Sequence, residues 1–263
     1  MTSNQKASIA QFRTRISARV NAPTGALAYV NVLRAPSPVA LAVLVGCALS
    51  AVYLRWSPSA PDLAAQVARA AVVRRAGNIS WWTGWFGGLS MPTYSVLAPS
   101  WMAAVGVRLA GVLAVVAGAA ATATLVRDTR RPRIGAVAFA AAGMADLLDG
   151  RVTFAIGLAI AAWTLVAVRE QWRLRGLVLG LATYLASPLA GLFLGLLLIA
   201  VVIVVRSRAR VAILVAAALL VVGLAMAVLF PGTGVMPFTV SDSIPALLCA
   251  AGVAVLCRER IVR

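Results

Sequence analysis

Histidine is absent from this chain of 263 residues, and the other residues that usually carry catalysis are scarce. Without histidine, the chain cannot use Ser-His-Asp or Cys-His catalysis or a His-ligated zinc ion. Its three cysteines, Cys47, Cys249 and Cys257, have no paired spacing, so they indicate neither a disulfide framework nor a cysteine metal site. Any acid or base must therefore come from seven carboxylates: Asp62, Asp128, Asp146, Asp149, Glu170, Asp242 and Glu259.

Charged residues are also few, at 12% of the chain, whereas hydrophobic residues make up 62% and the mean hydropathy is +0.95. These values are typical of an all-α polytopic membrane protein and lie outside the range of soluble domains. The net charge of +17 could suggest a nucleic acid as partner. The arginines, however, occur in short clusters between apolar runs, which is the positive-inside pattern. We therefore expect membrane lipids as partners and no nucleic acid.

Eight apolar runs predict a transmembrane bundle of about eight spans, several of them short. A cytoplasmic N-terminus places 18 of the 24 basic residues on one side of the membrane. This asymmetry predicts a multi-pass plasma-membrane protein with both termini in the cytoplasm. It has a basic N-terminal segment over residues 1–37, a transmembrane domain over residues 38–263 and an extracytoplasmic loop over residues 55–107. The predicted spans are residues 38–54, 108–126, 134–148, 152–168, 176–187, 189–205, 211–230 and 245–257.

Residues 176–205 leave two topologies open. Thirty residues are fewer than the about 40 that two full spans need, so one long helix kinked at Pro188 is one interpretation. That helix would place the arginines of residues 206–210 outside, against the charge pattern. We therefore predict a hairpin of two short helices that turns at Ser187-Pro188.

The first outer loop contains a helix of another kind. Ser59 followed by Asp62, and then apolar residues at helical spacing up to Gly77, predict a capped amphipathic helix on the membrane surface. Asp62 in its first turn has two interpretations. It could serve only the capping box, or its carboxylate could accept a proton from a sugar hydroxyl or hold a divalent cation.

The same loop is rich in tryptophan. Trp81, Trp82 and Trp85 could be interfacial anchors, because tryptophan is enriched at membrane surfaces. Sugar rings also stack on tryptophan faces, so these residues could instead line a sugar site.

Acidic and basic residues also lie close together in the sequence between the third and fourth spans, which the topology places on the same side of the membrane as the first outer loop. Asp146 and Asp149 are one helical turn apart and can share a face, and Arg151 could hold a phosphate. The alternative is a simple polar turn, which Asp149-Gly150 predicts in any case. Asp146 indicates function more strongly, because an acid within an apolar run is energetically expensive.

Three motifs carry a family resemblance. They are an Asp shortly after the first span (Asp62), the pattern WxxxWFGGxxxPxYSxLxP over residues 81–99, and GRxTF over residues 150–154. Together, across roughly residues 38–205, they resemble actinobacterial polytopic membrane proteins of the GT-C glycosyltransferase type. Proteins of that type transfer a sugar from a polyprenyl-phosphate donor to an extracytoplasmic acceptor.

The resemblance implies a GT-C-like bundle in which Asp62 is the catalytic carboxylate, which either deprotonates the acceptor hydroxyl or holds a metal ion. Asp146 and Asp149 are then the second acidic pair, which assists with a metal ion or the acceptor, and Mg²⁺ or Mn²⁺ is the implied cofactor. A single displacement would invert the sugar carbon. The remaining implied roles are donor-phosphate binding by Arg74, Arg75 and Arg151, and sugar or lipid contact by Trp81, Trp82, Trp85 and Tyr94.

Two other functions stay open. A transporter-like protein is one, since transporters often contain short, broken helices of the kind expected near Pro188. A non-catalytic scaffold or truncated fragment is the other, because GT-C enzymes usually have more spans and often a soluble C-terminal domain. The chain could also be a half that depends on a partner subunit for the missing helices.

Overall fold

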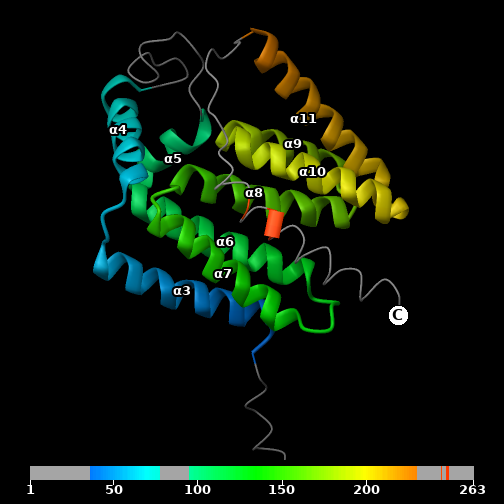
Figure 1. The fold of residues 1–263 in the computed structure, drawn as a ribbon, viewed down its shortest axis with the longest axis horizontal. Helices are drawn as coiled ribbons and strands as arrows, with labels where there is room; N and C mark the ends of the chain where they lie inside the picture. Colours follow the sequence, from blue (N-terminus) through cyan, green and yellow to red (C-terminus); the bar gives the residue numbers. More distant parts are fainter. Residues whose placement is uncertain (1–35, 78–94, 230–243, 245–246, 249–263) are drawn as a thin grey trace, which may run out of the picture. The chain divides into compact units, whose positions relative to one another are not determined.

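The computed structural model describes residues 36–77, 95–229, 244, 247 and 248 (Figure 1). The regular elements of residues 36–77 and 95–229 are all helical, which confirms the all-α prediction. Contacts divide the chain into two units, Met1–Leu220 and Val221–Arg263, and we describe the packing of the first. The elements are α3 (Pro38–Trp56), α4 (Pro61–Ala76), α5 (Leu97–Val105), α6 (Val107–Leu125), α7 (Pro132–Leu148), α8 (Val152–Arg169), α9 (Arg173–Ala186), α10 (Pro188–Val204), the 3₁₀ helix η2 (Arg206–Arg208) and α11 (Ala209–Leu229).

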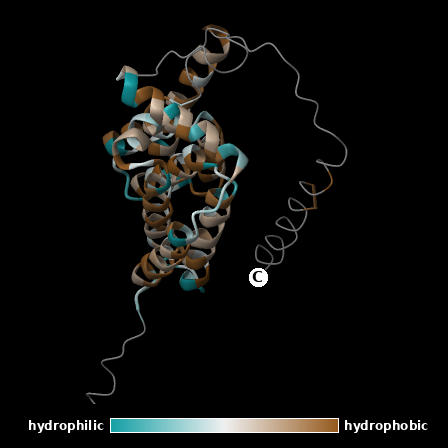
Figure 2. Ribbon diagram, turned by 90° about the vertical axis from the view of Figure 1, so that its left-hand side faces the viewer, coloured by the Kyte–Doolittle hydropathy of each residue, from teal (hydrophilic) through white to brown (hydrophobic). Residues whose placement is uncertain are grey.

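Seven of the eight predicted spans coincide with helices, and the eighth, over residues 245–257, lies outside the described residues except for Leu247 and Leu248. Within the described ranges, four helices are long and apolar enough to cross a membrane: α3, α6, α8 and the stretch Arg206–Leu229. Hydrophobic residues, brown in Figure 2, cover much of the helical surface. α7 and α9 have 17 and 14 residues, which rise only about 26 and 21 Å against a hydrocarbon core of about 30 Å. The count of about eight spans is therefore not confirmed.

Helix α8 packs between the α6–α7 pair and the α9–α10 pair (Figure 1). Small residues allow this close packing. A Cβ atom added to Gly157 of α8 would lie 2.7 Å from the Cβ atoms of Ser187 and Ala190. A Cβ atom added to Gly118 of α6 would lie 3.3 Å from the Cα atom of Ala159. The interior is therefore sensitive to the volume of single methyl groups.

The predicted hairpin is confirmed, because α9 and α10 are separate helices joined at Ser187 (Figure 1). The backbone N–H of Ala190 donates to Ser187 Oγ at 3.3 Å, which caps α10. Pro188 follows in the first helical position, where its missing N–H costs nothing. Before α9, Gln171 Nε2 donates to the carbonyl oxygen of Arg208 at 3.4 Å. The chain therefore returns after α10 to the end from which α9 starts.

The segment between α6 and α7 joins this same end through Arg169. The guanidinium Nη1 of Arg169 donates to the carbonyl oxygens of Thr124 and Leu125, at 2.8 and 3.0 Å, and Nη2 pairs with Asp128. A cation at the last carbonyls of α6 is favoured by the helix dipole. We call the three predicted cytoplasmic segments that meet here the basic end: residues 127–133, 169–175 and 206–210.

The opposite end holds α4 and α5, which both lie within the predicted outer loop over residues 55–107. Figure 1 shows that the axis of α4 crosses those of α3, α6 and α8 at a steep angle, close to the places where α3 ends and α8 begins. This is the orientation expected of a helix on a membrane surface. The sequence pattern does not predict α5, which ends at Gly106 with a φ of 94°, a conformation that favours glycine. Ser95 Oγ fixes the start of α5 by donating to the carbonyl oxygen of Ala186 at 2.6 Å.

Candidate functional site

Three predicted site residues meet at the end opposite the basic end. Arg151 Nε lies 3.8 Å from Asp62 Oδ2, and Arg151 Nη2 lies 3.9 Å from Asp149 Oδ2. We call Asp62, Asp149 and Arg151 the Arg151 cluster. Their side chains are 58%, 62% and 56% exposed, so each can be reached from outside. Exposed ion pairs contribute only about 0–1 kcal/mol, and a charged substrate group could therefore replace either partner.

The prediction that Ser59 caps the helix of Asp62 is wrong. α4 begins at Pro61, its N-cap is Ala60 in an extended conformation, and no side chain caps it. Proline favours the first helical position and forces the preceding residue into an extended conformation, so Pro61 fixes the start. Asp62 lies in the first turn as expected, where the helix dipole favours a carboxylate. Capping does not account for it, and its observed partner is Arg151.

The turn between α7 and α8 brings Arg151 to α4. Gly150 N–H donates to the carbonyl oxygen of Leu147 at 3.0 Å, and Arg151 N–H donates to that of Asp146 at 2.8 Å, which is a Schellman turn. Gly150 has a φ of 82°. A Cβ atom added there would lie 3.1 Å from the carbonyl carbon of Asp62, and closer still to the nitrogen of Leu63. The predicted turn is confirmed, and it fits against α4 only with glycine.

A buried hydrogen bond joins α4 to α8 one helical turn beyond Asp62. Thr153 Oγ1 donates to Gln66 Oε1, and the two residues are 1% and 9% exposed. Thr153 belongs to the GRxTF motif, whereas Gln66 belongs to no motif of the sequence. The position of Gln66 in the sequence could have indicated its role. Gln66 lies on the buried face of an amphipathic helix, where a polar side chain requires a hydrogen-bond partner.

Asp146 contributes to this site through its backbone, because its carbonyl oxygen accepts the N–H of Arg151. Its side chain is half-buried near the end of α7. Among the described residues it forms no ion pair. Of the predicted acidic pair Asp146 and Asp149, only Asp149 shares an ion-pair partner with Asp62 among the described residues, and that partner is Arg151.

Arg74 and Arg75 lie outside the Arg151 cluster. Both are exposed in the last turn of α4, and Arg74 is about 18 Å from Asp62 along the helix axis. A single phosphate on Arg151 would not reach them. The predicted sugar or lipid contacts lie outside the described residues: Trp81, Trp82, Trp85 and Tyr94.

The guanidinium of Arg151 occupies the position between the two carboxylates that were predicted to hold Mg²⁺ or Mn²⁺. It already places a cation 3.8 and 3.9 Å from Asp62 and Asp149, so a divalent ion would have to displace it. Within residues 36–77 and 95–229, no three acidic or cysteine side chains form a group that could hold a metal ion. The Mg²⁺ or Mn²⁺ that the resemblance implies stays a prediction, and the function proposed below requires no metal ion.

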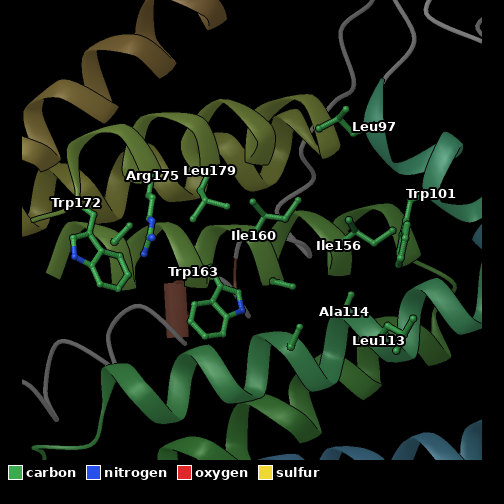
Figure 3. Close-up of a pocket in the computed structure, with 13 residues that line it drawn as sticks. Leu97, Trp101, Leu113, Ala114, Ile156, Ile160, Trp163, Trp172, Arg175 and Leu179 are labelled. Carbon is green, nitrogen blue, oxygen red and sulfur yellow. The ribbon is translucent and has the colours of Figure 1, made fainter. Parts of the chain in front are cut away.

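A groove of about 610 Å³ runs along α8, and the sequence does not predict it. Its walls are almost entirely apolar and come from α5, α6, α8 and α9. Figure 3 shows Trp101 toward one end, Trp163 along the wall, and Trp172 with Arg175 at the other end. The guanidinium carbon of Arg175 lies 4.7 Å from the centre of the Trp172 ring, which is a cation–π contact.

Comparisons with known protein families, curated proteins and solved structures find no match. The resemblance to GT-C glycosyltransferases therefore rests on the sequence motifs alone.

Arg108 is a further residue near the end that holds the Arg151 cluster, and it belongs to none of the predicted sites. Its Nη2 donates to the carbonyl oxygen of Pro58 at 2.9 Å, and its guanidinium carbon lies 5.8 Å from the centre of the Tyr53 ring. Both contacts join α6 to the link between α3 and α4. Arg108 therefore helps to set where α4, and with it Asp62, begins.

Proposed function

We propose that the chain is an integral protein of the plasma membrane, with the basic end in the cytoplasm and the Arg151 cluster on the outer side. The four long apolar helices support the membrane location. The basic end contains ten arginines and two carboxylates, Asp128 and Glu170, and such an excess marks the cytoplasmic side. Both termini are then cytoplasmic, and α4 lies on the outer surface.

We further propose that the Arg151 cluster transfers a sugar from a polyprenyl-phosphate donor to an acceptor hydroxyl. One observation carries this proposal: Asp62 of α4 and Arg151 of the α7–α8 turn, which are far apart in the sequence, lie 3.8 Å apart. Catalytic groups must converge on one reacting centre in this way. The motifs shared with GT-C enzymes supply the substrate class.

In this mechanism Arg151 binds the donor phosphate, and Asp62 is released from its ion pair. The acceptor oxygen then forms a bond to the sugar carbon while Asp62 takes the hydroxyl proton. The bond from that carbon to the phosphate oxygen breaks, and its electron pair leaves with the polyprenyl phosphate. Arg151 stabilises the charge of this leaving group, and Asp149 keeps the guanidinium oriented. One displacement inverts the sugar carbon.

The test is transfer by the full chain in membranes, measured with radiolabelled polyprenyl-phosphate hexose and pentose donors. We expect Asp62→Asn to reduce transfer by at least 100-fold, since general acid–base catalysis contributes about 10²–10⁴-fold. The matched control is Asp128→Asn, which removes a carboxylate that also pairs with an arginine, but at the basic end. Asp128→Asn should transfer at the wild-type rate.

Two results would contradict the proposal. One is full transfer by Asp62→Asn in a preparation where the wild type is active. The other is no transfer by the wild type with any donor of the panel, which would favour a non-catalytic scaffold. Equal protein levels and equal far-UV circular dichroism of the variants exclude a folding defect as the cause of any loss.

A further inference from the structure

The groove along α8 has a shape that suits an extended apolar chain. On α8 its lining runs from Ile156 to Ala167, which is about 16 Å of helix, and Leu97 and Trp101 of α5 line the end away from Arg175. Half of a hydrocarbon core of about 30 Å is about 15 Å, the depth of one leaflet. The α8 wall of the groove is therefore long enough to hold one acyl chain that enters from the basic end.

Charge at the groove selects the kind of lipid. Arg175 is the charged residue of the lining, and it is exposed beside Trp172 at the basic end (Figure 3). Both carboxylates of the basic end are already paired, Asp128 with Arg169 and Glu170 with Arg127. The described residues therefore offer Arg175 no carboxylate partner. The arginines of the basic end create a positive electrostatic potential, which would attract an anionic group.

We propose that the groove binds an acyl chain of an anionic phospholipid, with the lipid phosphate on Arg175. Tryptophans such as Trp172 favour the level of the lipid headgroups, because there the apolar part of the ring contacts the acyl chains while the ring N–H contacts water. The inference depends on the membrane location proposed above and not on sugar transfer, because no residue of the Arg151 cluster lines the groove.

The predicted eighth span, residues 245–257, is the rival occupant. Its C-terminal neighbours are Arg258, Arg260 and Arg263, which would add positive charge beside Arg175 if the span ended at the basic end. Like charges at close range are unfavourable. Charge complementarity therefore favours a phosphate at this position.

The probe is phosphatidylglycerol with brominated acyl chains, which quenches nearby tryptophan fluorescence. The full-length protein is reconstituted in phosphatidylcholine vesicles that contain increasing fractions of this probe. We expect stronger quenching than with brominated phosphatidylcholine. Arg175→Gln should reduce this preference about fivefold, the effect of one basic residue near an anionic surface. The matched control is Arg173→Gln, which removes an exposed arginine of the same helical turn outside the groove.

A second variant tests the groove itself. Ala117 is an exposed lining residue, and Ala117→Leu narrows the groove without changing any charge. It should weaken quenching by both brominated lipids. The inference is overturned if Arg173→Gln acts like Arg175→Gln, which indicates general attraction to the basic end. It is also overturned if Ala117→Leu leaves quenching unchanged, which indicates an occupied groove, or if polyprenyl phosphate relieves the quenching where unlabelled phosphatidylglycerol does not.

Discussion

Gly150 is the residue on which the position of α4 against the α7–α8 turn depends most directly. Its φ of 82° costs a residue with a Cβ atom about 1–2 kcal/mol. The new Cβ atom would also overlap the backbone of Asp62 and Leu63, which cannot rotate away as a side chain can. Overpacking of this kind costs about 1–3 kcal/mol. We therefore expect Gly150→Ala to destabilise the protein by about 2–5 kcal/mol.

Gly77 provides the control that separates the two contributions. It ends α4 with a φ of 75°, but among the described residues an added Cβ atom would have no neighbouring heavy atom within 4 Å. Gly77→Ala should therefore show the conformational cost alone. The difference between the two variants, about 1–3 kcal/mol, measures the contact between the turn and α4.

The assay is equilibrium unfolding of the purified protein in detergent micelles, followed by near-UV circular dichroism. Sugar transfer is measured on the same preparations, because a displacement of α4 away from the new Cβ atom would separate Asp62 from Arg151. Equal destabilisation by Gly150→Ala and Gly77→Ala would refute the reasoning, since α4 would then not touch the turn in the folded protein.

Two further predictions use the same assays. Gly157→Ala should destabilise the protein by about 1–3 kcal/mol, because its Cβ atom would lie 2.7 Å from the Cβ atoms of Ser187 and Ala190. Gly195→Ala should be neutral or slightly stabilising, because its Cβ atom would lie within 4 Å of no heavy atom in the described part of the chain. Equal effects in the unfolding titration would contradict the α8–α10 packing. Sugar transfer should persist in excess EDTA, because Arg151 places a cation beside both carboxylates of its cluster; a loss that Mg²⁺ or Mn²⁺ restores would show that a metal ion is required.

Local patterns predicted those parts of the fold that local physics determines. Long apolar runs located the helices, the Asp149-Gly150 pair located a turn, and Ser187-Pro188 with its flanking arginines located the hairpin. Each of these features depends on residues within one or two turns of one another. The same local reasoning failed at Ser59, where Pro61 determines the start of the helix.

Contacts between distant segments could not be predicted from such patterns. Neither hydrophobic periodicity nor charge indicates that Gln66 pairs with Thr153, or that Gly150 packs on Leu63. The groove along α8 is also the result of several helices packing together. The convergence of Asp62 with Arg151 was expected only because a shared reaction would require it, and the geometry meets that expectation while the chemical roles stay predictions.

The fold and the proposed chemistry of this site rest on different contacts. The ion pairs of the Arg151 cluster are more than half exposed, so losing one costs about 0–1 kcal/mol. The bond between Gln66 and Thr153 is buried, and removing one partner would leave an unpaired polar group at a cost of about 1–3 kcal/mol. Close packing at Gly150 also holds α4 without any charge. Substitution of Asp62 should therefore leave α4 in place, and a loss of transfer in Asp62→Asn would report the role of the carboxylate itself.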